Sequence, residues 1–142
     1  MIENSELIKQ VLSTLISISG RKTNTSHAIY MMDKTIDQLK DQYTFLDDIE
    51  LTDLTYSEEG EMITIMKDVN SISSVEFGSA LKDIINTLRN NLGNDAGHFF
   101  LKEVSQKIGD DSMSQMKLIG VDLHLMQLEQ NISKMESILY NK

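Results

Sequence analysis

Three histidines, His27, His98 and His124, are the side chains of this sequence whose ordinary pKa lies closest to neutral pH. An acid–base or metal site would therefore most naturally use one of them. On a helix, a metal site needs further ligands three or four residues away, and His124 has Gln127 and Leu128 at these positions. The spacing predicts no metal site, and we expect neither a cofactor nor catalytic residues.

Acidic pairs at 47–48, 58–59 and 110–111 are the second residue type that could do chemistry, since paired carboxylates hold hard cations or share a proton. No calcium-loop pattern surrounds them, so we interpret them as solvated turns and helix-start charges. The segment at 20–23, Gly-Arg-Lys-Thr, lacks the first glycine of a phosphate loop, because Leu15 stands there. No G-x-S-x-G motif occurs. We expect that the protein is not an enzyme.

Charge and composition exclude further classes. The 142 residues carry 13 Lys and Arg against 22 Asp and Glu, a net charge of −9, which repels phosphate backbones and anionic lipid. The absence of cysteine excludes disulfides, thiolate nucleophiles and Cys-based metal sites. Glu3, Glu6 and Lys9 do not fit a signal peptide, and the apolar cluster at 11–18 is too short to span a membrane. We expect a cytoplasmic protein without a membrane or nucleic-acid partner.

The elements that would position functional residues follow from hydrophobic periodicity and from the glycines, since the chain has no proline. We predict one domain, 1–142, of the α+β class, mainly helical, with about five helices and one β-hairpin at roughly 45–66. The predicted parts are a helical hairpin at 1–44, a β-hairpin at 45–70, two helices at 74–109 and a long C-terminal amphipathic helix at 112–141.

Local signals mark several of these elements. Ser73 followed by Glu76 fits a capping box and predicts a helix start, and Gly93 predicts its end. Alternation of Ile49 and Leu51 with acidic residues predicts a strand. Helices on both sides of the turn at Gly93 also suggest the hypothesis of a helix-turn-helix DNA binder. The shortage of basic residues in the second helix disfavours this hypothesis.

The C-terminal segment has the pattern with the largest physical consequence. Apolar residues step by 4, 3, 4, 3 and 4 along a predicted helix that only Gly120 weakens, and such a seam must be covered by another surface. A symmetric homodimer through this helix is the arrangement that we favour. The residues expected at the self-association surface are Val121, Leu125, Leu128, Ile132, Met135 and Leu139.

These observations favour a non-catalytic cytoplasmic regulatory or adaptor protein that acts through protein–protein contacts and self-associates through its C-terminal helix. The alternative is a small-molecule-sensing regulatory domain with an apolar pocket between the β-hairpin and the third and fourth helices. The residues expected to line that pocket are Met62, Met66, Phe77, Phe99 and Phe100.

Overall fold

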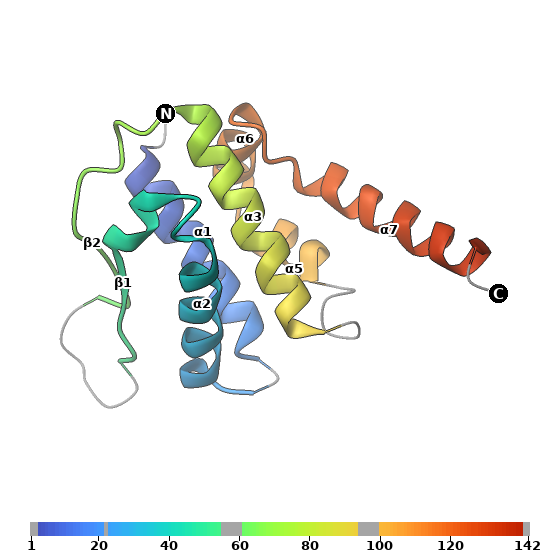
Figure 1. The fold of residues 1–142 in the computed structure, drawn as a ribbon, viewed down its shortest axis with the longest axis horizontal. Helices are drawn as coiled ribbons and strands as arrows, with labels where there is room; N and C mark the ends of the chain where they lie inside the picture. The colour runs from blue at the N-terminus through green and yellow to red at the C-terminus, as the bar shows by residue number, and fades with distance from the viewer. Residues whose placement is uncertain (1–2, 22, 55–60, 94–99, 141–142) are drawn as a thin grey trace.

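The computed structural model describes residues 3–21, 23–54, 61–93 and 100–140. Within these residues the chain forms six α-helices and one antiparallel hairpin of two short strands (Figure 1), which confirms the predicted mainly helical α+β class. The helix count exceeds the predicted five because the segment expected to form one long C-terminal helix forms two.

The first two helices, α1 (Asn4–Ser19) and α2 (Thr25–Leu39), confirm the predicted helical hairpin. Both bury the apolar stripe that their spacing predicted and pack against each other. Asn24 caps α2, since its side-chain oxygen accepts a hydrogen bond from the backbone N–H of His27 at 2.8 Å. A local capping interaction therefore marks the point where the connecting segment ends and α2 begins.

The hairpin pairs β1 (Ile49–Leu51) with β2 (Ile63–Ile65), with Ile49 opposite Ile65. The hairpin lies within the predicted range of roughly 45–66, and its first strand begins only at Ile49 because Thr44–Asp48 forms a 3₁₀ helix, η1. Phe45 and Leu46 are both buried, and alternation along a strand would place these consecutive side chains on opposite faces. The acidic pair at 58–59, which we interpreted as part of a turn, lies outside the described residues.

Helix α3 (Ser74–Leu92) crosses the centre of the molecule and packs against α2 and α1. The backbone N–H of Glu76 donates to Oγ of Ser73 at 3.3 Å, which confirms the predicted helix start. Phe77 is fully buried, with its ring centroid 5.9 Å from that of Phe45. Gly93 ends the helix with a φ of 87°, a conformation that favours glycine.

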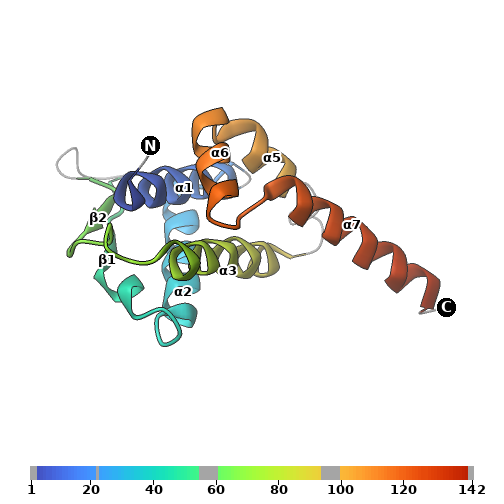
Figure 2. The ribbon, with the colours of Figure 1, turned by 90° about the horizontal axis from the view of Figure 1, so that it is seen from above.

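The last three helices are α5 (Phe100–Lys107), α6 (Asp110–Leu118) and α7 (Leu123–Tyr140). Helix α5 buries Phe100, Leu101 and Val104 and packs against α1. Figures 1 and 2 show that α5 and α6 lie against the helical core, whereas α7 extends away from it and carries the C-terminus at its far end.

A buried tyrosine ties the segment after α2 to α3. The Tyr43 hydroxyl donates to Oδ2 of Asp83 at 2.5 Å and lies 2.7 Å from Oγ of Ser79. Burial of the Tyr43 hydroxyl raises its pKa, and the hydrogen bond to the Asp83 carboxylate raises it further. The folded state therefore favours the neutral phenol more strongly than the unfolded state does.

We predict that Tyr43 makes stability fall at alkaline pH. Because the folded pKa is raised, its contribution is complete below the unfolded pKa of about 10 and is lost as pH rises through the folded pKa. The change Tyr43→Phe should cost about 1–2 kcal/mol at neutral pH through the lost hydrogen bonds. Urea unfolding of both proteins should show this difference shrinking above about pH 10. A difference that stays constant with pH would contradict the assignment.

Candidate functional site

The C-terminal segment is broken in the middle, so the prediction of one continuous helix over 112–141 is wrong. Gly120 has a φ of 93°. Its N–H donates to the carbonyl of Lys117 at 3.1 Å, and the N–H of Val121 donates to the carbonyl of Met116 at 2.8 Å. This pair of bonds is the Schellman motif that ends a helix at a left-handed glycine.

Val121 and the residue after it take roles that the periodicity did not predict. Val121 and Met116 are both 0% exposed, so Val121 belongs to the core and not to a self-association surface. Asp122 then starts α7, because its Oδ1 accepts from the N–H of Leu125 at 3.1 Å and its carbonyl accepts from the N–H of Met126 at 2.9 Å. Helix α7 thus points in a direction set by two adjacent caps.

The first turns of α7 fix it to the body of the protein. Leu123 and Met126 are buried, and α7 packs against α5. With 3.6 residues per turn, these two side chains lie on the opposite side of the helix from Leu125 and Leu128. The face that packs on the core is therefore not the face that carries the predicted heptad, which points outward.

The remaining heptad residues form an apolar surface that nothing in the described chain covers. Their side chains are between 48% and 63% exposed, and every residue from Asn131 to Leu139 is exposed. A helix this short and this exposed is only marginally stable in water without a packing partner. We call this surface the α7 seam, and it consists of Leu125, Leu128, Ile132, Met135 and Leu139.

The two sides of the α7 seam differ in chemistry. The helical period places Glu129 and Glu136 along one side, and His124, Asn131 and Ile138 along the other. Ile138 is 61% exposed and widens the apolar surface on its side. One edge of the seam is therefore acidic and the opposite edge is not, an asymmetry that determines how two such helices can pair.

The structure does not assemble the pocket that we expected from Met62, Met66, Phe77, Phe99 and Phe100. Met66 is 62% exposed, Met62 lines a shallow surface hollow beside α1, and Phe77 is sealed in the core. Phe99 lies outside the described residues. Figure 2 shows the physical reason, since the hairpin and α5 lie at opposite ends of α1.

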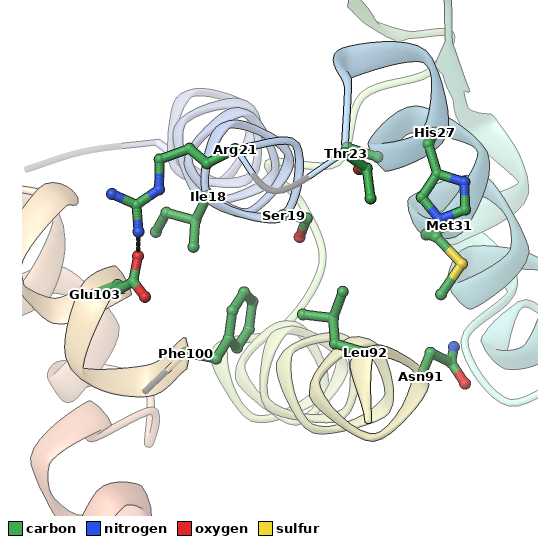
Figure 3. Close-up of a pocket in the computed structure, with 11 residues that line it drawn as sticks. Ile18, Ser19, Arg21, Thr23, His27, Met31, Asn91, Leu92, Phe100 and Glu103 are labelled. Carbon is green, nitrogen blue, oxygen red and sulfur yellow. Dashed lines mark ion pairs between the residues drawn. The ribbon is translucent and has the colours of Figure 1, made fainter. Parts of the chain in front are cut away.

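Phe100 instead lines a different cavity, of about 450 Å³, which sequence reasoning did not predict. It lies where the end of α1, the start of α2, the end of α3 and the start of α5 meet (Figure 3). Its apolar wall is formed by Ile18, Ala28, Met31, Leu92 and Phe100. Such a site depends on four separate chain segments meeting, and no local motif encodes that.

Polar groups lie at the two ends of this cavity. Arg21 forms an ion pair with Glu103 of α5 at one end, and His27 lies at the other. Of the other histidines, His124 is exposed on α7 and His98 lies outside the described residues. Over residues 3–21, 23–54, 61–93 and 100–140, no three Asp, Glu or His side chains gather as a metal site would require.

No described helix combines the length and apolar character needed to cross a bilayer. Comparison of the chain with protein-family models, with curated proteins and with solved structures gives no match. The site must therefore be interpreted from its own geometry, in which the α7 seam is a row of apolar side chains that the described chain leaves exposed.

Proposed function

We propose that the protein is a non-catalytic, cytoplasmic regulatory or adaptor protein that self-associates through α7. The observation that carries this proposal is the α7 seam, a row of aliphatic side chains on a helix that projects from the core. Monomeric proteins rarely expose contiguous apolar surfaces, and those that persist mark interaction sites. A partner surface would also supply the packing that the outer turns of α7 lack.

The occupant that fits the seam best is the α7 helix of a second copy, arranged in parallel. In an antiparallel pair, residues flanking the same side meet, which would bring Glu129 of one copy close to Glu136 of the other and repel. In a parallel pair, the acidic edge of one copy meets the edge formed by His124, Asn131 and Ile138. Ile132 and Leu128 then occupy the a and d positions of the heptad, and isoleucine at a with leucine at d favours two-stranded coiled coils.

The size of the seam implies a modest affinity. Each of the five seam side chains is about half exposed, so covering them on two copies contributes roughly 10 kcal/mol at about 1 kcal/mol each. Association costs at least about 4 kcal/mol, which leaves at most about 6 kcal/mol and a dissociation constant of tens of micromolar or weaker. Light scattering should therefore give a mass near 16.1 kDa in dilute solution, rising toward twice that value on concentration.

The orientation is testable with introduced cysteines, because the chain has none of its own. In a parallel pair the two copies of residue 135 face each other across the seam, so Met135→Cys should form a disulfide-linked dimer under mild oxidation. An antiparallel pair centred between residues 131 and 132 would instead place residue 135 opposite residue 128. It would then cross-link only the double variant Leu128→Cys/Met135→Cys.

The control is Ser133→Cys, an exposed position on the other side of α7. Its disulfide yield reports random collision and should be much lower than that of Met135→Cys. Equal yields for the two positions, together with a monomeric mass at the highest concentration, would remove the basis of the proposal.

A further inference from the structure

The cavity between α1, α2, α3 and α5 has the size of a small-molecule site. Its volume of about 450 Å³ lies inside the range of about 300–1,000 Å³ typical of ligand pockets. It is bounded by helix ends, so backbone and side-chain polar groups surround an apolar middle. It is also separate from the α7 seam, since α7 contributes no lining residue among those described.

The middle of the cavity is apolar. Figure 3 shows Phe100 and Leu92 on one side facing Ile18 and Ser19 on the other, with Met31 closing one end. The Phe100 side chain is almost fully buried, so its ring is held in place by the core where it borders the cavity. The Ser19 hydroxyl is already engaged, since it donates to the carbonyl of Leu15 at 2.7 Å. An aromatic or branched aliphatic body therefore matches this wall.

The charged groups at the rim favour an anionic end on such a ligand. Among the described lining residues, Arg21 and His27 are the basic side chains and Glu103 is the one carboxylate. The ion pair with Glu103 leaves other N–H groups of the Arg21 guanidinium available, since that group carries five donors. The Thr23 hydroxyl also lines this rim, and it donates to the carbonyl of Asn24 at 3.5 Å. Of the lining groups that the structure describes, the remaining N–H groups of Arg21 are therefore the donors that an entering anion would meet.

From this arrangement we infer that the cavity binds a small organic anion, of the carboxylate class, with an apolar body. The body packs on Ile18, Leu92 and Phe100, and the anionic group accepts hydrogen bonds from Arg21. The net charge of −9 repels anions at long range, so recognition depends on contacts inside the cavity. The inference stands independently of self-association through α7.

Two fluorescent probes test the site on the full chain: anilinonaphthalene sulfonate, which is anionic, and N-phenylnaphthylamine, its uncharged counterpart. We expect saturable binding of one anionic probe per chain. Arg21→Gln should weaken that binding at least about fivefold, and Glu103→Gln should strengthen it, because each changes one charge beside the probe. Binding of the uncharged probe should change little in either variant.

Filling variants test the location. Ser19→Leu and, separately, Leu92→Phe should each reduce binding of both probes about tenfold or more by occupying the cavity. Circular dichroism reports whether each variant is folded, and the two positions lie on different helices. The seam variant Leu128→Glu/Ile132→Glu should bind both probes as the wild type does. Binding that survives both filling variants, or that disappears in the seam variant, would overturn the inference.

Discussion

A chain in which Leu128 and Ile132 are both replaced by glutamate is expected to remain monomeric at concentrations where the wild type dimerises. The dimer loses four apolar side chains, two from each copy. Each is about half exposed in the single chain, so burying that half on association would have contributed about 1 kcal/mol. The total of about 4 kcal/mol raises the dissociation constant on the order of 1,000-fold. Burying four carboxylates would add to this cost. Light scattering over a concentration series measures the change.

The same variant should keep its fold, because Leu128 and Ile132 are 53% and 48% exposed in the single chain. Substitutions at such positions change the free energy of unfolding by about 0.5 kcal/mol or less. Ser133→Glu/Ser137→Glu is the matched control, with the same spacing and charge on the other side of α7, and it should dimerise normally. Unfolding of the seam variant at every concentration would instead place both residues in the core of one chain.

Elements defined by local chemistry could be predicted from the sequence. The helix start at Ser73 and the stripes of α1 and α2 depend on residues within one or two turns of each other, so spacing alone indicates them. The spacing of Leu128 and Ile132 also indicates that they share one face of a helix, and both lie on the α7 seam. These features need no knowledge of which segments meet in space.

The break in the C-terminal segment shows where periodicity fails. The apolar steps continue through Val121, so the heptad pattern does not reveal that Gly120 adopts a positive φ. Gly120 followed two residues later by Asp122 was a usable signal, since a glycine end and an acidic helix start are both capping residues. These two residues together predict a helix break between Leu118 and Leu125, which places Val121 outside the helix that carries the α7 seam.

The observed cavity could not be predicted because it depends on long-range packing. Met62 and Phe100 share an apolar character, but the hairpin and α5 pack on different parts of α1. The residues that line the observed cavity range from Ile18 to Glu103 and come from the ends of four helices. No local pattern specifies which ends meet, so composition could suggest the kind of pocket but not its residues.

Gly78 of α3 lies directly against the backbone of the link between α6 and α7. A Cβ placed on Gly78 would overlap the carbonyl oxygen of Ile119, the residue that ends α6 just before the turn at Gly120. That oxygen belongs to the backbone, so relief requires the link between α6 and α7 to move and not merely a side chain to rotate. Glycine at 78 is thus the residue that allows this link to lie against α3.

Gly78→Ala is therefore expected to destabilise the protein even though alanine is the better helix former. The propensity gain is about 1 kcal/mol, whereas overpacking typically costs 1–3 kcal/mol and more where backbone must move, so we expect a net loss of about 2 kcal/mol. Asn90→Ala, at an exposed position of the same helix, isolates the propensity term and should stabilise by about 0.5 kcal/mol. Urea unfolding of both variants measures the contrast. A stabilised Gly78→Ala protein would mean that α3 and the α6–α7 link do not touch.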